Sequence, residues 1–120
     1  MSAAPIMPPT REARFNVIAR SGGFLRRINS LITGTVNHLT LDIEDLEGNV
    51  YHLRVTPLHG DVTMDPQRDS VYNIGSAMAV FVDENGNELM QYPPVNVSLN
   101  LNTEVTAASM PVGTLTMWPS

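Results

Sequence analysis

The three histidines, His38, His52 and His59, carry the most versatile side-chain chemistry in this sequence. A histidine that faces a carboxylate is oriented for metal binding or for proton transfer. His52 meets this condition, because the strand register derived below places it opposite Asp42. His38 falls on the same face but several residue pairs away, too far to complete a set of metal ligands. The pattern therefore favours a cross-strand surface pair over a catalytic or metal site.

Two groups of acidic and amide residues have oxygen atoms that could bind a cation. Asp61, Asp65 and Asp69 are spaced by four residues in a polar segment, and the segment Asp83-Glu84-Asn85-Gly86-Asn87 resembles the start of a calcium loop. An EF-hand loop has glycine at its sixth position and glutamate at its twelfth. Counted from Asp83, the glycine is at the fourth position here and Pro94 is at the twelfth. We expect a solvated loop for the first group, with cation binding left open, and no calcium site for the second.

Several other classes of site are excluded by what the sequence lacks. It has no cysteine, and therefore no disulfide, no thiolate metal site and no cysteine nucleophile. It contains no glycine-rich phosphate loop, no Gly-x-Ser-x-Gly elbow and no zinc-ligand spacing. Asn96-Val97-Ser98 is a glycosylation sequon, but no secretion signal is recognisable at the start of the chain. We therefore predict no catalytic residue, no cofactor and no metal ligand, and a protein that is not an enzyme.

The charged residues are unevenly distributed along the chain. Five of the seven arginines lie in the first 27 residues against a single glutamate, which gives this segment a charge of +4. The remaining 93 residues hold two arginines and eleven acidic residues, a charge of −9. Because arginine binds carboxylates bidentately, this asymmetry favours contact between the front of one copy and the body of another, although ordinary solvated charge is the alternative. The predicted interaction arm consists of Ile6, Met7, Arg11, Arg14, Arg20, Arg26 and Arg27.

The composition also bears on the kind of partner. Phe15 and Phe24 are interleaved with the arginines, as in proteins that bind single-stranded nucleic acid, but the net charge of −5 weighs against a polyanion. No run of the roughly 18 apolar residues that a bilayer span needs is present, so we expect no membrane partner. A single domain of 120 residues has little interior to spare for a pocket, which weighs against a small ligand.

A hairpin is the most clearly predicted element. Residues 39–43 and 51–55 both alternate between apolar and polar side chains, and Leu46-Glu47-Gly48 fits a three-residue loop that ends in a left-handed glycine. This loop predicts the pairs Ile43–Tyr51, Leu41–Leu53 and Leu39–Val55 on an apolar face, and Asp42–His52, Thr40–Arg54 and His38–Thr56 on a polar face. The same turn chemistry recurs at 83–87, where it predicts the pairs Phe81–Leu89 and Val80–Met90.

The remaining segments complete the predicted architecture. We expect an extended, proline-rich N-terminal arm over residues 1–13 and a single domain over 14–120. Within the domain we expect strands at 14–20, 95–102 and 114–118, a short helix at 24–32 capped by Gly34, and a polar segment without periodicity at 57–70. The fold class is mostly β: a small antiparallel β-sandwich or barrel with two glycine-turn hairpins and one short helix.

The last segment, SMPVGTLTMWP at 109–119, resembles the stretch that opens the collar module of bacteriophage tail fibres. Pro111, Gly113, Thr114 and Trp118 carry this resemblance. It implies a phage virion protein, either a capsid cement (decoration) protein or a tail component, found in the virion after assembly in the host cytoplasm. The expected partners are other copies of the chain and other virion proteins. The alternatives are a small-ligand or glycan-binding β-barrel and an oligonucleotide-binding barrel.

Overall fold

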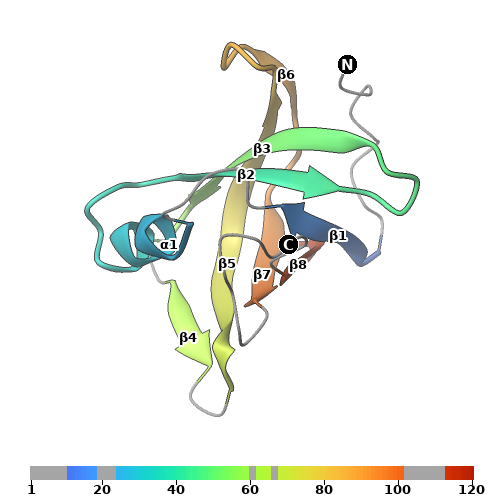
Figure 1. Cartoon of the computed structure of the whole chain (residues 1–120). Helices are drawn as coiled ribbons and strands as arrows, with labels where there is room; N and C mark the ends of the chain where they lie inside the picture. The colour runs from blue at the N-terminus through green and yellow to red at the C-terminus, as the bar shows by residue number, and fades with distance from the viewer. Residues whose placement is uncertain (1–10, 19–23, 60–61, 66–67, 102–112) are drawn as a thin grey trace.

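The computed structural model describes residues 11–18, 24–59, 62–65, 68–101 and 113–120, and Figure 1 shows how its elements are arranged. Strands dominate and one short helix is present, as the sequence predicted. In chain order the elements are β1 (Ala13–Ile18), α1 (Phe24–Ile32), β2 (Leu39–Glu44), β3 (Val50–Pro57), β4 (Thr63–Asp65), β5 (Arg68–Val82), β6 (Glu88–Gln91), β7 (Val95–Leu101) and β8 (Gly113–Pro119).

Six of these strands form a closed antiparallel barrel. Their hydrogen-bonded order is β3-β2-β1-β8-β7-β5, and a further pairing between β3 and β5 closes the circle. In Figure 1 the blue strand β1 lies beside the red strand β8, at the opposite end of the described chain. The sequence was compatible with a sandwich or a barrel. The β1–β8 and β3–β5 pairings make the fold a barrel.

β5 is the longest strand and is hydrogen-bonded along both of its edges. On one edge, its residues 71–77 pair with β7 and residues 80–82 pair with β6. On the other edge, residues 68–73 pair with β4 and residues 77–82 pair with β3. A bulge at Gly75, whose φ is 76°, shifts the register against β7. One strand therefore belongs both to the barrel and to the two hairpins that extend from it.

The inside of the barrel is filled with apolar side chains from all six strands. Its centre is a row of four aromatic rings in edge-to-face contact, in which Phe15, Tyr51, Phe81 and Tyr92 have successive centroid distances of 6.5, 5.6 and 5.0 Å. The aliphatic part of the core comprises Val17, Leu39, Leu41, Ile43, Leu53, Val55, Val95, Val97, Leu99, Leu101, Leu115 and Met117. The barrel is thus held together by burial of apolar surface, and its interior is a packed core.

The helix α1 covers one end of the barrel. Ile28 and Leu31 belong to the same buried cluster as the barrel interior, and the helix contacts β2. Gly34 follows the helix with a φ of 78°, and its N–H donates to the Leu31 carbonyl at 3.2 Å. The predicted helix and its glycine cap are both confirmed.

The register of the first hairpin is confirmed from Leu39↔Val55 through Ile43↔Tyr51. The turn also agrees with the prediction, because Gly48 has a φ of 86° and donates to the Asp45 carbonyl at 3.2 Å. The predicted pair His38–Thr56 is not part of this ladder, since β2 begins one residue later.

Two expectations about β5 are wrong. The segment at 57–70, predicted to lack periodic structure, contains β4 and the start of β5. In the second hairpin, Phe81 pairs with Met90 and Val80 with Gln91, one residue away from the predicted partners. A register shift between Phe81 and Val82 causes the difference, because it adds a residue on the β6 side that the turn alone does not predict.

Candidate functional site

The polar outer face of β2 and β3 carries the residues that the sequence singled out for chemistry. A shallow depression of about 370 Å³ lies here, and it is lined by His38, Thr40, His52, Arg54, Val82, Asp83, Glu84 and Gly86. A second depression, of about 260 Å³, shares His38 and Thr40 with the first and extends to Arg27 and Ser30 of α1. The two histidines that register arithmetic placed several pairs apart therefore border the same depression.

His52 and Asp42 form the predicted cross-strand pair. His52 Nδ1 lies 2.5 Å from Asp42 Oδ1, and both side chains are largely buried, with 17% and 19% of their surfaces exposed. Because a carboxylate accepts and does not donate, the Nδ1 atom carries the proton in this contact. His38 is held differently, with its Nδ1 atom 2.9 Å from the side-chain oxygen of Asn37. Asp42 orients the His52 ring, and among the described residues no comparable carboxylate contact orients His38.

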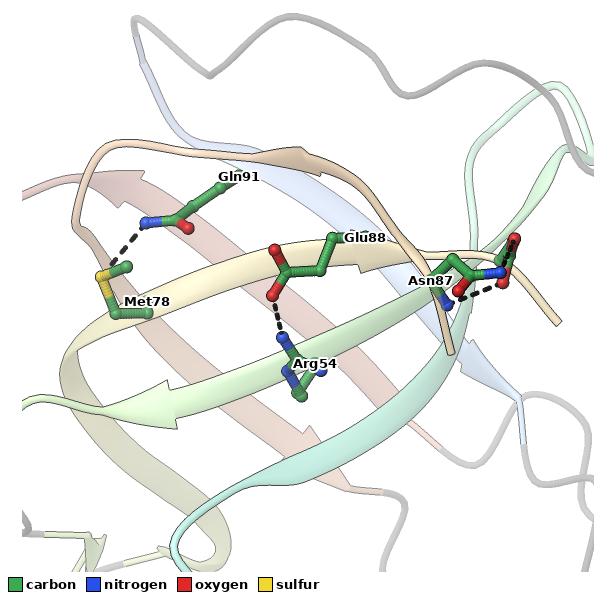
Figure 2. A network of polar contacts seen from close by, with 6 residues as sticks. Arg54, Met78, Asn87, Glu88 and Gln91 are labelled. Atoms are coloured by element: carbon green, nitrogen blue, oxygen red, sulfur yellow. Dashed lines mark hydrogen bonds and ion pairs between the residues drawn. The ribbon is translucent and has the colours of Figure 1, made fainter. Parts of the chain in front are cut away.

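Two other charged groups at this depression, Arg54 and Asp83, are engaged in contacts with their neighbours. Figure 2 shows Arg54 reaching from β3 to Glu88 of β6, with Arg54 Nη2 2.5 Å from Glu88 Oε1. In the same view Gln91 of β6 lies over Met78 of β5, and its Nε2 atom donates to the Met78 sulfur at 3.8 Å. These contacts tie β6 to the barrel strands β3 and β5. Arg54 is therefore used for structure and is not an unpaired cation in the depression.

Asp83 organises the turn beside the depression. Its Oδ1 atom accepts from the backbone N–H groups of Asn85 and Asn87 at 2.9 and 2.8 Å, and its Oδ2 atom accepts from the Asn87 side chain at 3.1 Å. The hydrogen bonds from Asn87 lower the pKa of Asp83 most, followed by those from Asn85 and Gly86. The Asp83 carboxylate thus holds the turn together through hydrogen bonds to the Asn85 and Asn87 backbone.

Asp45 organises the turn of the β2–β3 hairpin in the same way. Its Oδ1 atom accepts from the N–H groups of Glu47 and Asn49, both at 2.9 Å, and its Oδ2 atom accepts from Asn49 Nδ2 and from the Tyr51 hydroxyl. Burial alone would raise the pKa of Asp45, but the hydrogen bonds from Asn49, Glu47 and Tyr51 outweigh it and lower the pKa. The two matching sequence segments therefore reflect one turn motif used twice.

The predicted interaction arm does not lie on one element. Ile6, Met7 and Arg20 lie outside the described residues, while Arg11 and Arg14 are exposed at the start of β1 and Arg26 and Arg27 are exposed on α1. Arg14 Nη2 contacts Glu12 Oε1 at 2.7 Å, so the arginine meets the single acidic residue of its own segment. Arg14 is part of the barrel, because it pairs with Thr116 of β8.

Of the acidic group at 61–69, Asp61 and the side chains of Asp65 and Asp69 lie outside the described part of the structure. Among the described residues, no group of three histidine, aspartate or glutamate side chains is placed to hold a metal ion. Within the same residues, no helix has both the length and the apolar character needed to cross a bilayer.

A different outer face lies on β7 and β8, and we call it the neutral face. It consists of Asn96, Ser98 and Asn100 on β7 and Thr114, Thr116 and Trp118 on β8. These residues alternate with buried ones, so they point away from the core. The alternation of β7 was visible in the sequence, but its juxtaposition with β8 was not, because it depends on the strand order of the barrel.

Comparisons of the chain with protein families, with curated proteins and with solved structures give no match.

Proposed function

We propose that this protein is a non-enzymatic structural component of a larger assembly, a bacteriophage particle, in which it contacts copies of itself and other virion proteins. The observation that carries the proposal is the division between a packed interior and an outer surface on which several of the charged groups described above are engaged in structural contacts. Asp83, Asp45 and Arg54 hold turns and a hairpin in place. In this proposal the outer surface of the barrel makes the contacts with other subunits.

Two hairpins provide apolar side chains suited to contacts between subunits. Leu46 in the β2–β3 turn is 96% exposed, and Leu89 on β6 is 50% exposed. An exposed leucine in or beside the turn of a rigid hairpin gains about 1.5–3 kcal/mol when a partner buries it fully. Because the turns are fixed by Asp45 and Asp83, little conformational entropy is lost when such a tip docks.

The phage context is supported by the resemblance of residues 109–119, of which Gly113, Thr114 and Trp118 lie on β8. The charge asymmetry between the first 27 residues and the rest of the chain supports contact between copies. An oligonucleotide-binding role draws on the same arginines, and a steep loss of nucleic-acid affinity with added salt would favour it over the assembly proposal.

The first test is the mass of the full chain in solution, measured by sedimentation equilibrium over a range of protein concentrations. The proposal predicts species larger than the 13.1 kDa monomer, and their dissociation by salt if the arginines contribute. A monomer at every concentration would contradict self-association.

The second test separates the arm from the hairpins. Deletion of residues 1–10 keeps β1 and the Glu12–Arg14 pair, so the barrel should stay folded while the contribution of Ile6 and Met7 is lost. Leu46→Ser and Leu89→Ser should each weaken association, whereas Leu58→Ser, at a 43% exposed leucine just after β3, is the matched control. Equal effects of all three leucine substitutions would argue against specific contacts by the hairpin tips.

A further inference from the structure

The neutral face is a regular array of hydrogen-bonding side chains. In the ladder between β7 and β8, Asn96 is opposite Trp118, Ser98 is opposite Thr116, and Asn100 is opposite Thr114. Adjacent strands lie about 4.8 Å apart, and residues two positions apart on a strand lie on the same face. Three rows of paired side chains therefore stand on the outside of the barrel, two polar throughout and one with a tryptophan.

Among the residues whose side chains the structure describes, the array continues onto the strands on either side without adding an unpaired charge. On β5, Asn73 is opposite Ser98 and Ser76 is opposite Asn96. On β1, Asn16 is opposite Thr114, and Arg14, which is opposite Thr116, contacts Glu12. In a chain with twelve acidic residues, such a wide face without a free ionised group lacks the attraction that a charged partner requires.

The polar side chains of this face have hydrogen-bonding capacity to spare. Within the described part of the chain, the only hydrogen bond from a side chain of the neutral face runs from Asn96 Nδ2 to the Pro119 carbonyl, at 3.5 Å. The Ser98, Thr114 and Thr116 hydroxyls and the Asn100 amide each offer both donor and acceptor atoms. A partner that satisfies them must itself carry many hydroxyl or amide groups.

Trp118 adds the apolar component that a polar array lacks. It is 36% exposed at the end of the row that contains Asn96. An indole ring offers a flat apolar surface beside hydrogen-bonding neighbours, which suits a ligand that has one apolar face and a polar rim. A pyranose ring has this character, with C–H groups on its faces and hydroxyl groups around its edge.

We propose that the neutral face binds an uncharged glycan, with Trp118 against a sugar ring and the Asn, Ser and Thr side chains of β7 and β8 bonded to its hydroxyl groups. The six described side chains of the face carry no charge, which matches an uncharged ligand and disfavours an anionic polysaccharide. An apolar protein surface is equally disfavoured, because it would leave the hydroxyls and amides of the face without partners. The proposal does not depend on self-association.

The experiment uses the full chain and its single tryptophan as the reporter. Cellohexaose, maltohexaose and chitohexaose serve as uncharged probes, with dextran sulfate as the anionic probe. We expect at least one uncharged probe to change the Trp118 fluorescence in a saturable and salt-independent way. Response to dextran sulfate alone, or to none of the probes, would overturn the proposal.

Matched substitutions then locate the site. Thr116→Val removes a hydroxyl from the middle of the neutral face, and Thr40→Val makes the same change on the outer face of β2. Thr116→Val should weaken binding about fivefold, as expected for one lost hydrogen bond, and Thr40→Val should leave it unchanged. Trp118→Ala should abolish measurable binding. Because this variant lacks the fluorescent reporter, its binding is measured by calorimetry and its folding is checked by circular dichroism. Binding that survives Trp118→Ala, or that is lost in Thr40→Val, would place the site elsewhere.

A second copy of the chain is the other occupant that the test distinguishes. If Thr116→Val and Trp118→Ala change the sedimentation mass while no probe binds, the neutral face is an interface between copies and the glycan proposal is wrong. Retained assembly together with lost glycan binding in these variants would support the glycan site and leave the proposed structural function intact.

Discussion

Replacing Gly113 by alanine should be among the single substitutions in the barrel strands that lower the free energy of unfolding most. Gly113 begins β8 and lies between Leu101 of β7 and Val17 of β1 in the strand ladders. A Cβ atom there would lie 2.4 Å from the Asn100 carbonyl oxygen and 2.9 Å from the Leu101 Cα atom. Both are backbone atoms, so the clash is relieved only by moving β7 and β8 apart.

The expected loss of unfolding free energy can be compared with that at Gly48, a glycine that is needed for its backbone conformation. Overpacking in a tightly packed region costs roughly 1–3 kcal/mol, and we expect about 3 kcal/mol here because neither backbone atom belongs to a flexible side chain. Gly48 has a φ of 86° but nothing within 4 Å of its added Cβ atom. Gly48→Ala should therefore cost only the left-handed backbone penalty, about 1 kcal/mol.

Urea unfolding followed by Trp118 fluorescence and by circular dichroism measures both variants. With an m-value of roughly 1.5 kcal/mol/M, the midpoint should fall by about 2 M for Gly113→Ala and by less than 1 M for Gly48→Ala. Equal midpoints for the two variants, or a larger fall for Gly48→Ala, would refute the argument that close strand approach dictates glycine at position 113.

Three further changes test the turns and the core. The pKa values of Asp45 and Asp83 are lowered in the folded chain, so the stability that these carboxylates contribute is complete above the unfolded-state pKa near 4 and is lost as the pH falls through the folded-state pKa values. Asp83→Asn should therefore flatten the acid side of a stability–pH profile measured by urea titrations. An unchanged profile would contradict this. Burial, and to a smaller extent the nearby Tyr51, raises the pKa of Tyr92 to about 12. The stability that the neutral Tyr92 contributes is therefore complete below pH 10 and is lost as the pH rises from about 10 to 12. Tyr92→Phe should reduce this alkaline loss of stability in thermal melts, and an equally steep loss in the variant would count against the argument. Phe81→Ala should lower the free energy of unfolding by about 4 kcal/mol in urea, because it removes two edge-to-face contacts and leaves a cavity. Leu46→Ala, at a 96% exposed side chain, should change the free energy of unfolding by less than about 0.5 kcal/mol. Similar costs for the two variants would mean that the aromatic row is not a central part of the core.

The parts of the fold that were predictable are those in which local turn chemistry and side-chain alternation agree. In the β2–β3 hairpin, Gly48 fixes the turn and the alternation fixes the same register independently. Strand β5 lacked this agreement, because its first three residues are all polar and the bulge between Asn73 and Gly75 interrupts the alternation that follows. Closure into a barrel depends on the β3–β5 and β1–β8 pairings, which join segments far apart in the chain and leave no local signal.

The candidate sites show the same division. The contact between His52 and Asp42 followed directly from the hairpin register and is confirmed. The engagement of Arg54 by Glu88 could not be predicted, because it requires the β5–β6 hairpin to lie against β3. The neutral face was partly visible as the alternation of β7, but Thr116 and Trp118 join it only through the ladder between β7 and β8.

The pairing of residues 13–17 with residues 113–117 has a consequence for how the chain reaches its native state on the ribosome. Strand β1 emerges first, yet one of its two neighbours is synthesised about a hundred residues later. Contacts of such long sequence separation slow folding, because a large loop must be ordered before they form. Until then β1 has an unpaired edge, so a nascent chain stalled before β8 should be open to aggregation or to chaperones.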